Sequence, residues 1–452
     1  MIVHRPALLQ HAAHPFQPPA RPSNPRAAGW RFENRHMQQS SRGRRLAVSL
    51  LALGLASGAH AADGTNPAPT WSLSGFGTVG AVHSSEPNAD YTASVLKSSG
   101  AGATRRWSMD VDSRLGVQLD LALDKRWSAV LQVVSEQDLN NSYRPRVEWA
   151  NVKYQATPEL ALRLGRIALP MFLTAEYRRI GYVYPWVRPP VEGYGALPFT
   201  SGDGVDANYR WTLGPVRNTT QVFYGHADVA LIAPMRAYGR RVTGLANTSD
   251  WGALSVRASV IGVEATTTLG AELFDALRAL GPASGALARA YAIDHKRISV
   301  ASAGASYDPG RWFLMAEASR THSESLLGST RSAYASAGWR HGDFTPYATW
   351  STVRATSPTS TPGLALAGLA PPLAYQAAAL NAGLNALLAT IPQQDSASIG
   401  LRWDLHANMA LKLQYDRVSP HGGSRGTLIN QTPGFESGRT AHVASVALDF
   451  VY

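Results

Sequence analysis

The chain has 452 residues, of which 16% are charged and 45% are hydrophobic, with 40 glycines and no cysteine. Soluble domains carry about 25% charged residues, whereas the mean hydropathy of −0.15 argues against a bundle of membrane helices. The lack of cysteine excludes disulfides, zinc–thiolate sites and thiol nucleophiles.

The first predicted element is an export signal over residues 37–61. Its basic start is formed by three arginines: Arg42, Arg44 and Arg45. An apolar run over residues 46–56 follows, and a small-x-small cleavage motif ends the segment. The alanines around the predicted cleavage are Ala59, Ala61 and Ala62. A short buried helix is the alternative, but it would not explain the basic flank and the alanines together.

Residues 1–36 are rich in Pro, Arg and His and show no periodicity. We predict that they are an untranslated or disordered extension, that translation starts at Met37, and that the mature chain covers residues 62–452. Residues 1–61 hold eight Arg and one Glu, so the net charge falls from +11 for the whole chain to +4 for the mature part. The nucleic-acid binding that a pI near 9.9 would suggest therefore loses its support.

From Ala62 onward, apolar and polar side chains alternate with a period of two. Residues 107–123 keep this alternation over about seventeen residues. Globular strands are about five or six residues long, whereas a tilted membrane strand needs about nine to eleven. Sixteen such segments begin near Trp71, Arg105, Arg126, Arg146, Leu160, Gly204, Arg217, Ala237, Trp251, Arg297, Trp312, Arg331, Phe344, Ser396, Met409 and Ala441. The even number predicts an all-β fold, a closed antiparallel transmembrane β-barrel of 16 strands.

The predicted connections alternate between short and long. The short ones are residues 124–125, 157–159, 212–215, 248–250, 308–311, 341–343 and 406–408, and the longest of the others are about 169–203, 263–296, 355–394 and 419–440. Short turns at one end and long loops at the other are typical of outer-membrane barrels, with the turns in the periplasm and the loops outside the cell.

Tryptophan supports the same arrangement. Seven of the twelve lie within about three residues of a short turn or of the mature amino-terminal end: Trp71, Trp127, Trp211, Trp251, Trp312, Trp339 and Trp403. Because indole prefers the membrane–water boundary, we expect an aromatic belt at this level.

The last strand runs to the final residue of the chain. Val446, Leu448, Phe450 and Tyr452 fall on one side of the alternation. We expect them to face lipid while the strand pairs with the first one, which leaves no unpaired edge in the bilayer. The terminal aromatic, with apolar residues at alternate positions before it, resembles the carboxy-terminal signal that the Gram-negative outer-membrane assembly machinery recognises.

The segments "WSLSGFGTVGAVHSSE", "WSMDVDSRLGVQLD", "VEWANVKY", "GRIALPMFL" and "YPWVRPPVEGYG" resemble the proteobacterial general porins, and the resemblance covers Trp71 to Tyr452. It implies a homotrimer of barrels in the outer membrane of a Gram-negative bacterium, a water-filled channel for small hydrophilic solutes and ions, and no cofactor. It also implies that the third long connection, residues 169–203, folds inward as a constriction.

The alternation predicts which charged residues face the lumen. Arginine and lysine candidates on the wall are Arg114, Arg163, Arg166, Arg257, Arg340, Arg402 and Lys412. The connection 169–203 contributes Glu176, Glu192 and Asp203 against Arg178, Arg179 and Arg188. We expect Arg163 and Arg166 to be the wall residues opposite the loop. The lumen arginines and the +4 charge suggest a weak anion preference.

Two apolar helical patches, residues 269–280 and 373–391, lie inside long loops and are predicted to be lids over the mouth or surfaces for a partner. A ligand-specific transporter and a structural or adhesive barrel remain alternatives to the diffusion channel. The short segment before the first strand leaves no room for a plug domain, and the inward face is expected to be consistently polar. No H-E-x-x-H or similar catalytic pattern indicates an enzyme or a metal site.

Overall fold

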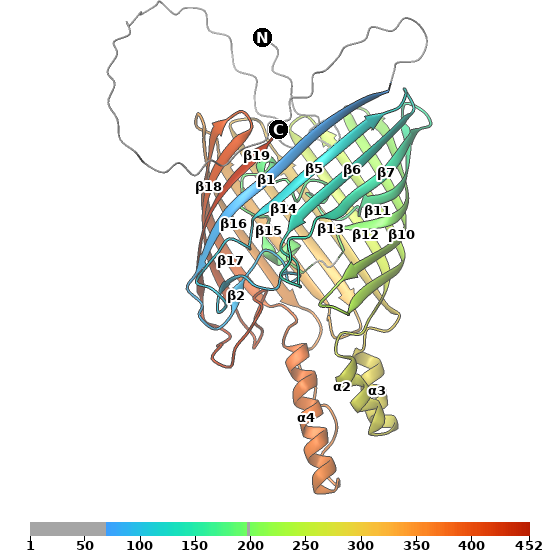
Figure 1. The fold of residues 1–452 in the computed structure, drawn as a ribbon, viewed down its shortest axis with the longest axis vertical. Helices are drawn as coiled ribbons and strands as arrows, with labels where there is room; N and C mark the ends of the chain where they lie inside the picture. Colours follow the sequence, from blue (N-terminus) through green and yellow to red (C-terminus); the bar gives the residue numbers. More distant parts are fainter. Residues whose placement is uncertain (1–68, 197–198) are drawn as a thin grey trace, which may run out of the picture.

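The computed structural model describes residues 69–196 and 199–452 (Figure 1). Its sheet is a closed antiparallel barrel in which each strand pairs with the next and β1 pairs with β19. The strands are β1 (Thr70–Ser84), β4 (Trp107–Ser108) with β5 (Arg114–Ala122), β6 (Trp127–Glu136), β7 (Arg146–Gln155), β8 (Leu160–Ala168), β9 (Ser201–Leu213), β10 (Val216–Ala230), β11 (Arg236–Trp251), β12 (Leu254–Thr267), β13 (Lys296–Tyr307), β14 (Trp312–Ser323), β15 (Thr330–Trp339), β16 (Phe344–Ala355), β17 (Gln394–His406), β18 (Met409–Pro420) and β19 (Ala441–Val451). With β4 and β5 counted as one interrupted strand, the barrel has the predicted sixteen, and each begins within about three residues of its predicted start.

The second strand is interrupted where an unbroken alternation was predicted. Residues 109–113 leave the sheet between β4 and β5. Val111 and Asp112 are both buried, with 0% and 1% of their surfaces exposed, although alternation places them on opposite faces. Val111 packs with Val82 and Tyr91, while Asp112 binds Arg188 of a distant loop. The unbroken alternation predicted over residues 107–123 is therefore wrong at Val111, because the segment turns inward, where Asp112 pairs with Arg188.

The connections alternate in length as predicted, and all the long ones lie at the end that carries the helices (Figure 1). The turn predicted at 248–250 is wrong, since these residues lie inside β11. The chain turns instead at residues 252–253, where Gly252 has φ +58°. The turn between β9 and β10 likewise narrows to residues 214–215, where Gly214 has φ +57°. Two-residue hairpin turns require positive φ, which glycine adopts without strain.

The barrel closes where β1 meets β19. The outward residues Gly75 and Gly77 have no side chains, and the rings of Tyr452 and Phe450 lie over them: a Cβ added at either glycine would come within 2.3 Å of a ring atom. Aromatic cover over strand glycines fills the gap that they leave in the sheet surface. The last residues are therefore held by packing as well as by pairing.

The outer surface is apolar, and tryptophans ring it near the short turns. Six of the seven predicted belt tryptophans are between 38% and 60% exposed, and Trp312 is half-buried. Tyr452 is 54% exposed at the same end.

Three helices project beyond the barrel from the end with the long loops: α2 (Ala271–Ala279), α3 (Pro282–Tyr291) and α4 (Pro371–Leu388) (Figure 1). They share a small apolar core that includes Phe274, Leu277, Leu384 and Leu388. Both predicted helical patches thus form helices. Within residues 69–196 and 199–452, no helix has the length and apolar character needed to cross a membrane.

Candidate functional site

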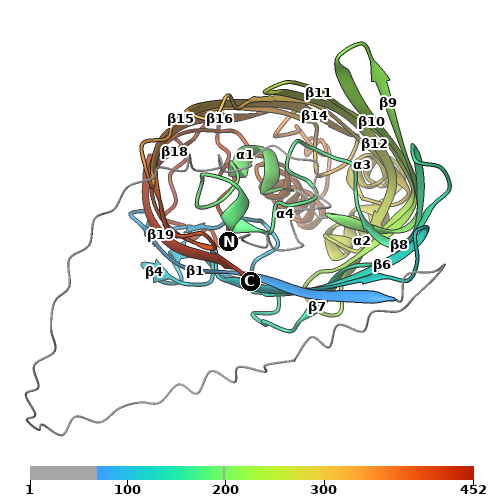
Figure 2. The same cartoon turned by 90° about the horizontal axis from the view of Figure 1, so that it is seen from above.

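The connection between β8 and β9, in its described residues 169–196 and 199–200, turns back into the barrel instead of extending away from it. Seen along the barrel, this segment and its short helix α1 (Val191–Tyr194) lie inside the ring of strands (Figure 2). It also contains the single turn η2 (Gly181–Val183). We call residues 169–196 and 199–200 the inner loop.

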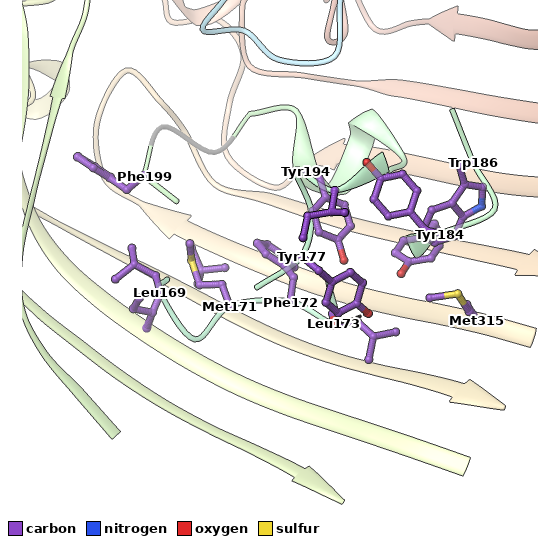
Figure 3. Close-up of a cluster of buried hydrophobic side chains, with 14 of the residues drawn as sticks. Leu169, Met171, Phe172, Leu173, Tyr177, Tyr184, Trp186, Tyr194, Phe199 and Met315 are labelled. Carbon is purple, nitrogen blue, oxygen red and sulfur yellow. Dashed lines mark hydrogen bonds between the residues drawn. The ribbon is translucent and has the colours of Figure 1, made fainter. Parts of the chain in front are cut away.

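Aromatic side chains hold the inner loop against the inner wall. Tyr184, Trp186 and Tyr194 are 1%, 1% and 4% exposed, and they lie in one cluster with Phe172 and Tyr177 (Figure 3). The wall contributes inward Phe76, Val134, Ile167, Phe223, Val242, Ile261, Val300, Phe313, Met315, Tyr334 and Tyr347. The expectation of a consistently polar inner face is therefore wrong. Burial of this apolar surface stabilises the loop inside the barrel.

Lys412 of β18 fastens the middle of the inner loop. Its Nζ donates hydrogen bonds to the carbonyls of Gly181 (2.6 Å), Tyr184 (2.7 Å) and Trp186 (2.9 Å). It also forms an ion pair of 2.8 Å with Asp449, and both side chains are 0% exposed. Lys412 faces the lumen side of the sheet as predicted, but Asp449 and the carbonyls of the inner loop compensate its charge.

Two arginines also bind the inner loop to the wall. Arg402 belongs to the wall, and Arg188 belongs to the loop. Arg402 of β17 donates to the carbonyls of Tyr182 (2.5 Å) and Tyr184 (3.1 Å) and pairs with Asp404. Arg188, which belongs to the inner loop, donates to Asp112 (2.6 Å) and to Ser445 (2.7 Å) of the wall. A second ion pair joins it to Asp416 at 3.3 Å.

The carboxylate of Glu192 attaches α1 to the wall through hydrogen bonds. Glu192 is 5% exposed and accepts hydrogen bonds from Ser351 (2.7 Å), Gln394 (2.6 Å) and Ser396. Among the described residues Glu192 forms no ion pair with an arginine, and its partners are Ser351, Gln394 and Ser396 instead of the arginine wall that the sequence suggested.

Glu317 of β14 secures both ends of the inner loop. It accepts the Leu173 backbone N–H at 2.8 Å and the Tyr194 hydroxyl at 2.5 Å. The loop is thus bound at both of its ends by one buried carboxylate.

A charged network lies where the inner loop passes β6 and β7. Glu136 binds both Arg146 and Arg179, and Arg179 also binds Glu148 at 2.9 Å. Lys97 lies nearby, and burial lowers the pKa of its ammonium group to about 8.

Three of the arginines predicted to line the passage, Arg114, Arg178 and Arg257, have no carboxylate partner within the described part of the chain. Arg114 donates only to the Asp112 carbonyl (3.1 Å), and Arg257 donates only to the Thr248 hydroxyl (3.2 Å), which leaves two of its nitrogens buried without a partner. No ion pair involves Arg178 either; burial, with Arg179 as a second cause, lowers its pKa to about 10, so it stays charged at neutral pH. Glu176 is a partly exposed carboxylate of the same loop as Arg178.

The two predicted wall arginines separate onto opposite faces. Arg163 points inward and forms a buried ion pair with Asp206, which Gln221 also contacts. Arg166 pairs with Asp203 at 2.6 Å and follows the parity of Leu162 and Leu164, which are 42% and 64% exposed. The register therefore places Arg166 and Asp203 on the outer face, and the prediction that Arg166 lines the lumen is wrong.

Arg340 lies at the short-turn end rather than at the constriction. It binds Asp308 at 2.6 Å and the Gly310 carbonyl at 2.8 Å, which links two neighbouring turns. Sequence reasoning missed Glu148 and Trp186 as functional residues, and it placed Glu136 and Glu317 in the lumen only by alternation. The sequence places their charge or ring on inward positions, but does not show that the inner loop reaches them.

No group of His, Asp or Glu in residues 69–196 and 199–452 could hold a metal ion. The predicted cleavage residues Ala59, Ala61 and Ala62 and the start Met37 lie outside the described residues.

The sequence matches a family model described as Gram-negative porin over residues 47–427. No curated protein gives a significant match. OmpF of Salmonella typhi, solved in complex with daunomycin, shares 10% sequence identity with a TM-score of 0.51, and the alignment covers 84% of this chain and 97% of that one. For DcaP of Acinetobacter baumannii the identity is 11% and the TM-score 0.49, over 85% and 98% of the two chains. For a loop-L8 deletion mutant of Vibrio cholerae OmpT the identity is 10% and the TM-score 0.46, and the alignment covers 85% of this chain and 100% of that one.

Proposed function

The chain belongs to the Gram-negative porin family, and from this premise we propose how its channel selects solutes. The barrel is an outer-membrane channel, with its short turns on the periplasmic side and its long loops on the extracellular side. We propose that the inner loop forms the constriction and that the passage beside it weakly prefers anions.

The observation that carries this proposal is a set of arginines without a carboxylate partner, whereas Glu192 and Glu317, which have no cationic partner either in the part of the chain that the structure describes, are only 5% exposed and fully engaged in hydrogen bonds. Lys412, Arg188 and Arg402 are neutralised by carboxylates or bound to carbonyls, so they contribute little free charge to the passage. Arg114, Arg178 and Arg257 lack a carboxylate partner among the described residues.

Glu176 is the partly exposed carboxylate that the inner loop sets against these arginines. A narrow passage with low-dielectric walls concentrates the field of such charges. Salt limits the effect, because charges are screened over about 8 Å at physiological ionic strength.

The same contacts favour passive diffusion over a gated transporter. The inner loop is bound along its length by Glu317, Lys412, Arg188 and Glu192, which supports a fixed constriction. We accordingly propose transport without catalysis and without a gating movement of this loop.

Reversal potentials in a planar bilayer test the proposal. With a KCl gradient, Arg178→Gln and Arg257→Gln should each shift the reversal potential toward cations. The matched control is Arg340→Gln, a lumen-side arginine at the periplasmic turns that should leave selectivity unchanged. Equal shifts in all three variants, or none in the first two, would place the selective region elsewhere.

Three further parts of the proposal concern maturation and assembly. We propose cleavage before Ala62, recognition of Val446, Leu448, Phe450 and Tyr452 by the assembly machinery, and a homotrimer in the membrane. These four side chains lie on the outer side of β19, where a partner protein reaches them before the barrel closes. Replacing Phe450 and Tyr452 by serine should reduce insertion, measured as heat-modifiable protein in outer-membrane fractions. Unchanged insertion would contradict the assigned signal.

A further inference from the structure

The connection between β16 and β17 carries no charged side chain. No Asp, Glu, Lys, Arg or His occurs among the forty residues 355–394. Helix α2 beside it has the charges of a solvated helix, with Glu272 in its first turn and Arg278 in its last. The last turn of α3 likewise contains Arg289. The surface of α4 therefore differs in kind from that of the other two helices beyond the barrel.

The start of α4 lies far from the barrel and is poor in polar groups. Only residues 389–393 join its other end to β17, and α4 extends along the barrel axis beyond α2 and α3 (Figure 1). Ala370 at its N-cap forms no side-chain hydrogen bond among the described residues, and Pro371 and Pro372 follow it. A helix start in water usually has Ser, Thr, Asp or Asn at the N-cap. The two prolines have no N–H, so they remove two of the unpaired donors of a helix start.

The end of this projection exposes large apolar side chains. We call residues 364–375 the tip. Leu366, Leu373 and Tyr375 of the tip are 42%, 38% and 79% exposed. Large apolar side chains gathered on a water-facing surface mark a site of interaction. The lipid around the strands does not cover the tip, because the tip points away from the membrane that the barrel crosses (Figure 1).

Two asparagines of α4 hold the tip in place without using charge. Asn381 accepts a hydrogen bond from the Leu364 N–H (2.7 Å) and donates one to the Leu364 carbonyl (2.9 Å). Asn385, one turn further along α4, forms the same pair of bonds with Thr361 (2.7 and 3.0 Å). Leu384 packs the base of α4 into the apolar core that it shares with α2 and α3. The tip is therefore the end of a supported, uncharged helical projection.

The area of the tip is too small for a stable contact between two copies of the chain. Such a contact buries about 800 Å² on each partner. An aromatic side chain buries at most about 250 Å², so the three exposed side chains offer roughly 400 Å² together. A lipid bilayer needs no matching protein area. It penalises charge and unpaired backbone donors, and the tip has no charge and few such donors.

We propose that the tip inserts into the surface of a lipid bilayer that faces the outer membrane. Leu366 and Leu373 enter the apolar layer, and Tyr375 lies at the boundary between headgroups and acyl chains, which suits its hydroxyl group. The protein thereby attaches its own membrane to a second one. This activity is independent of conduction through the barrel.

Flotation with phosphatidylcholine vesicles tests the proposal. The full protein is placed in lipid nanodiscs, so that its strands are covered and only its loops and turns meet water. The wild type should float with the vesicles. Leu366→Ser/Leu373→Ser should weaken partitioning about a hundredfold, because each leucine moved from water into an apolar layer contributes roughly tenfold. Unchanged partitioning of the double variant would overturn the proposal.

The matched control is Leu327→Ser. Leu327 is 41% exposed in the connection between β14 and β15, at the same end of the barrel but outside the tip. Its variant should float like the wild type, and an equal loss would remove the special role of the tip. Heat-dependent mobility in SDS checks that each variant folds. If the double variant does not fold, Tyr375→Asp, at the most exposed side chain of the tip, should lower partitioning at least about tenfold.

Two further measurements distinguish the bilayer from other partners. Because residues 355–394 are uncharged, partitioning should not depend on salt concentration or on added anionic lipid. Dependence on either would assign the binding to charged residues and contradict the proposal. Nanodiscs without vesicles should stay dispersed. Self-association that requires Leu366 and Leu373, without flotation, would make a second copy of the chain the partner and overturn the lipid assignment.

Discussion

Replacing Lys412 by methionine tests whether a buried cation holds the constriction in place. The substitution keeps an unbranched side chain that is one atom shorter but removes three hydrogen bonds to loop carbonyls, and it leaves Asp449 buried without its cation. Removing one member of a buried ion pair typically costs about 3–5 kcal/mol, because the remaining charge is uncompensated.

The expected loss of stability is smaller when the charges of Lys412 and Asp449 are removed together. Lys412→Met/Asp449→Asn eliminates the buried pair together, so the double variant should recover a large part of the lost stability. Lys153→Met is the control, because Lys153 also faces the lumen from β7 but forms no ion pair within the described part of the chain. Its effect should stay within about 0.5 kcal/mol.

Two assays follow these variants. Unfolding in urea, monitored by the heat-dependent shift in SDS gels, measures stability. Single-channel recording reports on the mobility of the inner loop. The loop should fluctuate in Lys412→Met and produce current noise that the wild type lacks. If Lys412→Met had wild-type stability and showed no added current noise, Lys412 would not be the residue that holds the inner loop in place.

The remaining predictions concern selectivity and maturation. Arg178→Glu should shift the reversal potential toward cations more than Arg163→Glu, because Arg163 is already paired with Asp206. Anion preference should decline as the pH rises through about 8, since burial lowers the pKa of Lys97 to that value and its positive charge is lost above it; a preference that is constant from pH 6 to 9 would contradict this. Deleting residues 176–192 should raise single-channel conductance, and an unchanged conductance would place the constriction elsewhere. N-terminal sequencing of the exported protein should begin at Ala62, and any residue before Met37 would contradict the predicted start.

The strand pattern was predictable because lipid outside and water inside impose a strict period of two. The wrong strand predictions lie where a long-range contact or typical turn residues compete with this period. At Val111 and Asp112 the chain leaves the sheet to reach Arg188, a partner 76 positions away in the sequence. The turn at Gly252 was misplaced by a few residues, because Thr248, Ser249 and Asp250 are typical turn residues that here lie in β11.

The candidate site was harder to predict than the barrel. Alternation placed Lys412 and Arg402 on the inner side, but it could not show that backbone carbonyls of the inner loop bind them. The spacing of Arg163 and Arg166 was informative, since residues three apart on a strand lie on opposite faces. Parity with Leu162 and Leu164 therefore indicates the outward position of Arg166 from the sequence alone.

The central claim is that this barrel is an open channel whose fixed inner loop leaves arginines without carboxylate partners, among the described residues, beside the passage. The most direct test is the current through the purified protein in a planar bilayer under a tenfold KCl gradient. Stable conductance steps, with a reversal potential of the sign set by chloride, are the result we expect. A silent membrane, or a reversal potential of the sign set by potassium, would contradict the account.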